Sequence, residues 1–216
     1  MMKKRVVYLS LSLGLLGFAM AAWTLTARAG YESAEYRVVE SDGAFEVREY
    51  PDLVLASTES ELDSQGRDGS FMRLFRYISG NNETEQSIAM TTPVFMESED
   101  GQPNVSMGFV MPREVAEEGA PAPTGRAVEI RKREGGRFAV VRFAGQLNSK
   151  SARENEAKLR DWMTARGLKG SVASESAGYD PPFTPGPLRR NEVLIRLDSS
   201  ETQAAMTRVA KRRGEP

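Results

Sequence analysis

The chain has 216 residues, of which 40% are hydrophobic and 27% are charged, and its formal net charge is −1 at pH 7. This length and composition suit one globular domain that buries its own core. The sequence contains no cysteine and no histidine. Disulfides, thiolate nucleophiles, Ser-His-Asp triads, histidine zinc sites and a proximal-histidine haem site are therefore excluded.

Residues 1–29 have the pattern of an export signal. Three basic residues at 3–5 precede an uncharged run over 6–25, and the sequence Ala-Arg-Ala at 27–29 has the small-x-small form of a cleavage site. The uncharged run is also about as long as a membrane-spanning helix, roughly 20 residues. We therefore expect either a signal peptide or an N-terminal membrane anchor. In both cases the domain is expected in the periplasm, soluble or tethered to the inner membrane by residues 6–25.

Charge limits the partners of the exported domain. Cleavage after residue 29 would remove four basic residues and no acidic one, which takes the net charge from −1 to −5. A mildly acidic domain argues against nucleic acid as a partner. Membrane contact is expected only through the N-terminal segment.

The first half of the domain reads as two strands, a helix and two strands. Two apolar-rich runs within 35–50 flank a Ser-Asp-Gly turn, which predicts a β-hairpin whose glycine supplies a positive φ. Apolar residues at i, i+3, i+4 and i+7 predict a helix over 69–79, with Gly80 as its stop. Segments 88–96 and 104–112 then predict a strand pair, and the second of them alternates as a half-buried strand does.

The second half repeats this order after an exposed linker at 112–125 that is rich in Pro, Ala and Glu. Residues 129–143 predict a hairpin that turns at Glu-Gly-Gly. The next helix is expected to start at Ser151, with Glu154 completing a capping box. Strands are expected at 178–183 and 191–197, and the polar tail 198–216 is expected to fray.

Each half is too small to bury its own sheet face, so the halves should share one core. The predicted fold class is α+β: two ββαββ pseudo-repeats forming one bent antiparallel sheet or distorted β-barrel with two helices. One domain would span residues 30–197. On the second helix, Leu159, Trp162 and Met163 are expected to face the sheet.

Several motifs resemble the SOUL haem-binding protein family. "AGYDPPFTPGPLRRNEVLI" resembles the C-terminal signature of the family, and "YESAEYRVVE" with "FEVREY" resembles its first hairpin. "FMRLFRYISGNN" followed by "IAMTTPVFM" resembles its first helix and Met-Thr-x-Pro-Val strand, and "MGFVMP" the strand that closes the first half. The resemblance covers residues 31–197. In its last block, the prolines predict a rigid turn that holds Arg189, Arg190 and Glu192, either as a structural clamp or in direct ligand contact.

The resemblance implies binding of haem or a related tetrapyrrole in a shallow hydrophobic cleft beside the first helix. The matching positions are Phe71, Leu74, Phe75, Arg76 and Met90. The two phenylalanines could support the ring, and Arg76 or Arg73 could pair with a propionate. An apolar stripe with this spacing is more often buried core than a cofactor site, so both interpretations stay open.

Without histidine, the side chains left to ligate haem iron are Met, Tyr or Lys. By position the candidates are Met72 and Met90. If neither ligates the iron, apolar contact and propionate pairing alone would hold the ligand, which suits reversible carriage. The other strand methionines are expected to fill the core, and Glu97 is expected to be solvated. No catalytic residue is identified. A tetrapyrrole-modifying enzyme, for example one that removes the metal, and a binding module for another apolar ligand or protein partner remain as alternatives.

Overall fold

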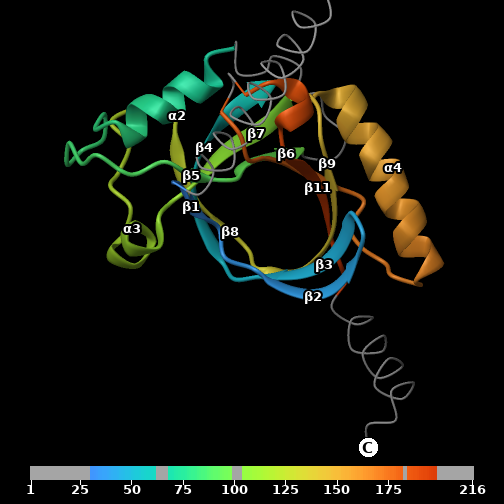
Figure 1. Cartoon of the computed structure of the whole chain (residues 1–216). Coiled ribbons are helices and arrows are strands. Elements are labelled where there is room, and N and C mark those ends of the chain that lie inside the picture. Colours follow the sequence, from blue (N-terminus) through green and yellow to red (C-terminus); the bar gives the residue numbers. More distant parts are fainter. Residues whose placement is uncertain (1–29, 62–67, 99–103, 182–183, 199–216) are drawn as a thin grey trace, which may run out of the picture.

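The computed structural model describes residues 30–61, 68–98, 104–181 and 184–198. Across these ranges the fold is α+β, with a nine-stranded antiparallel sheet, a separate two-stranded sheet and three α-helices (Figure 1). The expected export signal and residues 199–216 of the expected tail lie outside the described residues. No helix in the described ranges is long and apolar enough to cross a membrane.

The elements of the first half follow the predicted order, but the structure adds one nine-residue strand that was not predicted, β4, and two short ones, β1 and β5. They are β1 (Glu32–Ser33), β2 (Arg37–Asp42), β3 (Phe45–Tyr50), β4 (Leu53–Glu61), α2 (Ser70–Ile78), β5 (Thr91–Thr92), β6 (Val94–Ser98) and β7 (Asn104–Val110). The first hairpin is confirmed, because β2 pairs with β3 and Gly43 has a φ of 61°. The predicted strand pair is confirmed as well, since β6 pairs with β7.

The second half begins with a short helix in the segment that was expected to be a linker. Its elements are α3 (Arg113–Glu118), β8 (Glu129–Arg133), β9 (Gly136–Phe143), α4 (Ser149–Ala165), β10 (Glu175–Gly178), a 3-10 turn (Gly186–Leu188) and β11 (Asn191–Arg196). The expected exposure of this linker is wrong at Pro121, which is buried and accepts a hydrogen bond from the Tyr77 hydroxyl at 2.8 Å. The linker thus folds back onto α2.

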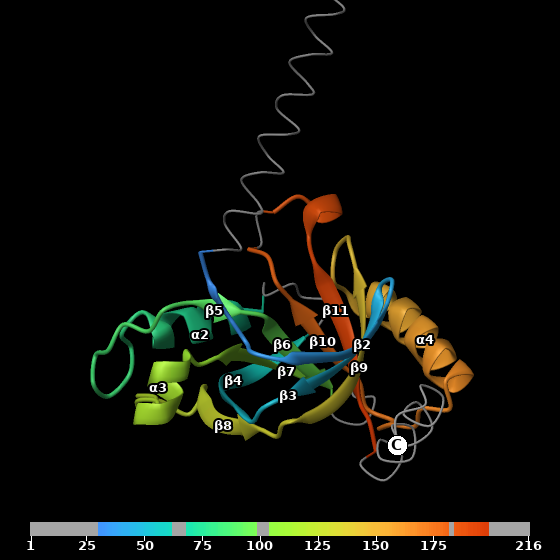
Figure 2. The same cartoon turned by 60° about the horizontal axis from the view of Figure 1, so that its bottom comes forward.

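The two halves interleave in the main sheet, whose strand order is β2-β3-β9-β11-β10-β6-β7-β4-β8. Strands β9, β11 and β10 of the second half lie between β3 and β6 of the first. The end strands β2 and β8 do not pair with each other, so of the two expected forms the bent open sheet is the right one. Figure 2 shows α2 and α3 at one end of the molecule and α4 at the opposite end.

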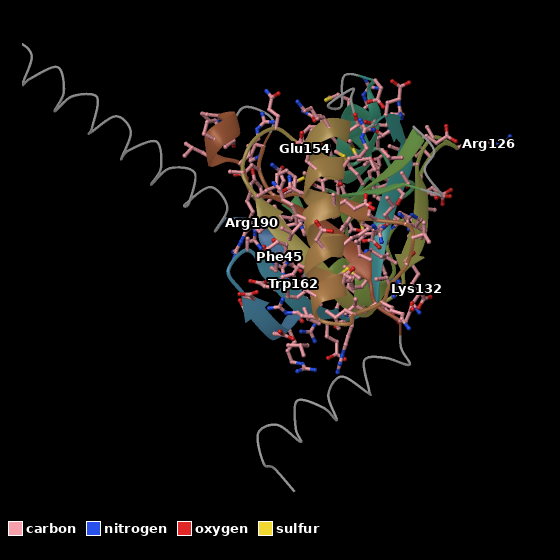
Figure 3. The ribbon with its side chains drawn as sticks, turned by 90° about the vertical axis from the view of Figure 1, so that its right-hand side faces the viewer. Phe45, Arg126, Lys132, Glu154, Trp162 and Arg190 are labelled. Carbon is pink, nitrogen blue, oxygen red and sulfur yellow. The ribbon has the colours of Figure 1, made fainter. Side chains whose placement is uncertain are left out.

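Three hydrophobic clusters fill the fold. The inner one, between the curved strands, includes Tyr50, Phe95 and Phe138. On the outer face α4 covers β9 and β11, while α2 covers β4 and β7. The predicted burial of Trp162 is confirmed: the side chain is 8% exposed and stacks on Phe45, with ring centroids 5.4 Å apart (Figure 3).

The predicted second hairpin is wrong. Strand β8 pairs with β4, whereas β9 pairs with β3 and β11. The Gly-Gly step instead makes a corner against the β3–β4 connection, where a Cβ on Gly135 would lie 2.6 Å from the carbonyl oxygen of Tyr50. Glycine is therefore required there for close backbone approach and not for a two-strand turn.

Two predicted boundaries also differ from the structure. Helix α4 begins at Ser149, because Asn148 caps it and forms a capping box with Ser151. Strand β10 (Glu175–Gly178) ends at the first residue of the segment 178–183 where a strand was expected. It lies between β6 and β11, so prolines, which cannot donate to a ladder, are excluded from it.

Candidate functional site

Helix α2 is held to the end of β4 by Asp68, which precedes it. One carboxylate oxygen accepts hydrogen bonds from the Ser70 backbone N–H (3.1 Å) and hydroxyl (2.7 Å), and the other accepts from the Glu61 N–H (3.0 Å). Burial raises the pKa of Asp68, but these hydrogen bonds outweigh it and lower the pKa to about 2. The aspartate is therefore charged at neutral pH and fixes the start of the helix.

Arg73 makes a second attachment between α2 and β4. Its guanidinium donates to the Thr58 hydroxyl (3.0 Å) and to the carbonyl oxygens of Glu59 (2.6 Å) and Asp68 (3.1 Å). These bonds occupy the fork of the side chain and direct it toward the protein. Of the two arginines considered for a propionate, Arg73 is thus committed to holding the helix.

The outer surface of α2 is apolar over one turn. Met72 is 45% exposed and Phe75 is 43% exposed. The ring of Phe75 stacks nearly parallel to that of Phe71, with centroids 6.1 Å apart, and Phe71 meets Phe109 edge-on at 5.3 Å. We call Phe71, Met72 and Phe75 the α2 apolar face.

The other predicted site residues surround this face in different ways. Leu74 is fully buried, so it supports the helix from below and does not meet solvent. Met90 is half-buried and packs against the cluster that α2 covers. Arg76 is exposed, and within the described residues its guanidinium makes no hydrogen bond or ion pair. The structure therefore brings an unpaired cation beside an exposed apolar surface.

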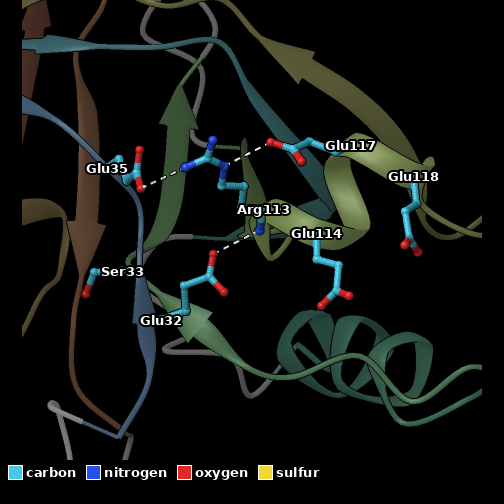
Figure 4. A pocket seen from close by; sticks show the side chains of 7 residues that line it. All are labelled: Glu32, Ser33, Glu35, Arg113, Glu114, Glu117 and Glu118. Carbon is cyan, nitrogen blue, oxygen red and sulfur yellow. Dashed lines mark hydrogen bonds and ion pairs between the residues drawn. The ribbon is translucent and has the colours of Figure 1, made fainter.

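Two hollows lie near α2. The smaller, of about 170 Å³, separates the helix from the folded-back linker. It is lined by Arg73, Arg76, Tyr77, Asn81, Pro123, Thr124, Gly125, Ala127 and Val128. The larger, of about 440 Å³, is formed by β1, its following loop and α3 (Figure 4).

The larger hollow is acidic and does not suit a tetrapyrrole carboxylate. Five glutamates and Ser33 surround a single arginine, Arg113, whose guanidinium pairs with Glu35 and Glu117 and whose backbone N–H donates to Glu32 (Figure 4). The remaining charge is negative and would repel a second carboxylate. Across the described ranges, no group of three or more His, Cys, Asp or Glu side chains could hold a metal ion.

Sequence reasoning found only part of a charged network inside the sheet. The residues expected at the rigid turn belong to this network or lie beside it: Arg190 pairs with Glu192 at 2.7 Å, and Arg189 donates to the Thr184 carbonyl at 2.7 Å. The network also contains Arg48, which is buried and was missed. Arg48 alternates with Glu46 along β3, and a charged alternating face normally predicts solvent exposure, so the sequence signal misleads at this strand.

A second buried charge cluster corrects the expectation for Glu97. Its carboxylate is mostly buried and pairs with Arg131 at 2.7 Å. Opposite it on β10, Glu175 pairs with Arg133, which lies over the rings of Phe95 and Phe138. Both carboxylates are thus structural groups inside the fold and not solvated surface charges.

Comparisons with known proteins identify relatives over most of the chain. A sequence model described as "SOUL heme-binding protein" matches residues 31–196. Heme-binding protein 1 of Xenopus laevis is 32% identical over 176 residues, which cover 76% of this chain and 91% of that protein. Heme-binding protein 1 of Mus musculus is 28% identical over 180 residues, 80% of this chain and 90% of that protein.

Solved structures resemble this one in fold alone. The C-terminal domain of EcmrR gives a TM-score of 0.54 at 12% identity, and the match covers 76% of this chain and 98% of that domain. A hydrolase from Listeria innocua gives a TM-score of 0.50 at 12% identity, and the match covers 74% of this chain and 94% of that chain. At such identities the likeness says nothing about ligand or reaction.

Proposed function

Because the chain belongs to the SOUL heme-binding protein family, we propose that it binds haem or a related tetrapyrrole on the α2 apolar face, without histidine ligation. The main support is that Met72 and Phe75, both nearly half exposed, lie on one helical turn. Beside them is Arg76, which has no partner among the described residues. Clustered large apolar side chains on a surface are typical of binding sites. The family membership supports the ligand class, and this exposed apolar surface supports the proposed location.

The side chains fit the chemistry of such a ligand. The ring of Phe75, backed by Phe71, offers a flat apolar support on which a conjugated macrocycle can stack. Arg76 can pair with a propionate through a charge-assisted hydrogen bond. Leu74, beneath the helix, keeps this face in position, and Met90 completes the packing behind it.

The lack of histidine shapes the proposed role. Haem, when bound, would supply a planar apolar ring, two carboxylates and an iron with open coordination positions. The thioether of Met72 is the exposed sulfur on this face, and thioethers are known iron ligands. A shallow site that holds its ligand mainly by stacking and one ion pair suits reversible carriage, which is the role we propose.

Titration of the purified full-length protein with ferric haem, followed by Soret absorbance, tests the proposal. We expect saturable binding whose spectrum lacks the signature of two imidazole ligands. Phe75→Ala should weaken binding of haem and metal-free porphyrin alike, since it removes ring contact. Arg76→Ala should weaken binding by about threefold to thirtyfold, and high salt should reduce this effect.

Val172→Ala serves as the matched control, because Val172 is 89% exposed and lies in a loop after α4. It should leave haem binding unchanged. The proposal fails if the protein shows no saturable Soret change. The assignment to α2 fails if Phe75→Ala and Arg76→Ala both fold normally and bind haem as tightly as the unmodified protein.

A further inference from the structure

We propose that the hollow between α2 and residues 123–128 is an anion pocket that receives a carboxylate arm of the tetrapyrrole. This inference rests on the function proposed above and adds where the charged edge of the ligand lies. The hollow has a volume of about 170 Å³ and opens beside Arg76. It is thus of a size for a substituent and not for a whole macrocycle.

The charge of the hollow is positive. Arg73 and Arg76 both line it, and neither forms an ion pair with a carboxylate of the described residues. The bonds of Arg73 go to a hydroxyl and two carbonyl oxygens, so they engage each nitrogen of its guanidinium without cancelling its charge. Arg126, which is exposed, stands between two lining residues. A concave surface lined by charge of one sign concentrates the opposite ion.

The two hydroxyl groups of the hollow are already bonded within the protein. The Tyr77 hydroxyl donates to the Pro121 carbonyl at 2.8 Å, and the Thr124 hydroxyl contacts the Asn81 side chain at 3.2 Å. Among the lining cations that the structure describes, Arg76 is the one whose guanidinium has no hydrogen-bond partner, so its donors are available. A carboxylate, which only accepts hydrogen bonds when ionised, matches that donor.

Arg76 also joins the hollow to the α2 apolar face. It follows Met72 by four positions and Phe75 by one, and residues four apart lie side by side on a helix. A planar ligand on the apolar face therefore meets Arg76 at its edge, and an arm on that edge can enter the hollow. The site should accordingly discriminate between tetrapyrroles with free and with esterified carboxylates.

Filling the hollow tests this inference without altering any charge. Metal-free protoporphyrin and its dimethyl ester are titrated into the full-length protein, and the ratio of their dissociation constants is measured. We expect the free acid to bind about threefold to thirtyfold more tightly. Ala127→Leu, at a lining position, should bring the ratio close to one and leave ester affinity unchanged. Ala122→Leu, an exposed position of the same segment outside the lining set, should keep the original ratio.

The ester affinity reports folding in each variant. If Ala127→Leu fails to fold, Gly125→Leu replaces it, because a Cβ at Gly125 meets no atom within 4 Å. The anion pocket is overturned if Ala127→Leu leaves the ratio of the two dissociation constants unchanged, or if Ala122→Leu lowers it equally. In either case porphyrin binding itself still stands. If neither porphyrin binds the unmodified protein, the proposed function itself fails, so the two failures are distinguishable.

Discussion

At the scale of single residues, Glu192 is the centre of a buried ion network. Its carboxylate accepts hydrogen bonds from Arg48 (2.7 and 2.9 Å), from Arg190 (2.7 and 3.0 Å) and from the Tyr179 hydroxyl (2.9 Å). Burial raises the pKa of Glu192, but the two arginines outweigh it and lower the pKa below the usual value for a glutamate. The network therefore stays ionised and ties β11 to β3 within the sheet.

Glu192→Gln should destabilise the fold strongly, because it leaves the buried Arg48 without its main counter-charge. Loss of one partner of a buried pair costs about 3–5 kcal/mol, measurable as the free energy of unfolding in urea. Glu154→Gln, which breaks only an exposed pair with Lys150, should change stability by less than about 0.5 kcal/mol. A loss below about 1 kcal/mol in Glu192→Gln would contradict the role of the network.

The pH dependence supplies a second readout for the same variant. A lowered folded-state pKa means that Glu192 contributes stability above its unfolded pKa, about 4.3, and that this contribution disappears as pH falls through the folded value. The difference in unfolding free energy between the unmodified protein and Glu192→Gln should therefore shrink at acidic pH. Glu175 acts in the opposite sense, since burial raises its pKa and favours its protonated form.

At the scale of elements, α4 depends on one aromatic contact. Trp162 stacks on Phe45, its indole N–H donates to Asp42 at 3.0 Å, and Arg166 lies 4.2 Å above its ring. Trp162→Ala should cost roughly 3–5 kcal/mol of unfolding free energy, as large-to-small core changes do. Calorimetry or urea unfolding measures this cost. If Trp162→Ala lowers the unfolding free energy no more than Ala152→Gly on the same helix does, α4 does not rely on this contact.

Pairings between strands adjacent in the chain were predictable, and pairings between strands distant in the chain were not. Local patterns suffice for the β2–β3 hairpin and for α2. The Gly-Gly step before β9 has the composition of a hairpin turn, but the partner of β8 is β4, more than 70 positions earlier in the chain. Nothing within residues 129–143 encodes that pairing, since turn chemistry is local and strand pairing depends on the whole fold.

The sequence placed the candidate residues on one helix, but it did not determine which of them are exposed. Leu74 and Phe75 belong to one stripe, yet the first is fully buried and the second is 43% exposed. Only packing of α2 on β4 and β7 decides between them. The commitment of Arg73 to backbone carbonyls and the return of the linker onto α2 likewise depend on contacts between segments far apart in the sequence.

At the scale of the whole molecule, the two pseudo-repeats differ in how their helices cover the sheet. Helix α4 has 17 residues and buries its large aromatic side chain, whereas α2 has nine and leaves Phe75 and Met72 at the surface. The repeat with the shorter helix is thus the one with an open apolar face. In the proposed function, this asymmetry assigns the tetrapyrrole to the half that carries α2.

The expected cleavage site lies just before the first described strand of the fold. Strand β1 pairs with β5, and the Ala34 N–H donates to the Thr92 carbonyl at 2.7 Å, so the first element begins two residues after Gly30. Cleavage between Ala29 and Gly30 would therefore leave every described element intact. We expect intact-mass measurement of the protein exported by a bacterial host to give a chain that starts at Gly30. A protein that keeps residues 1–29 and sediments with membranes would instead identify that segment as an anchor.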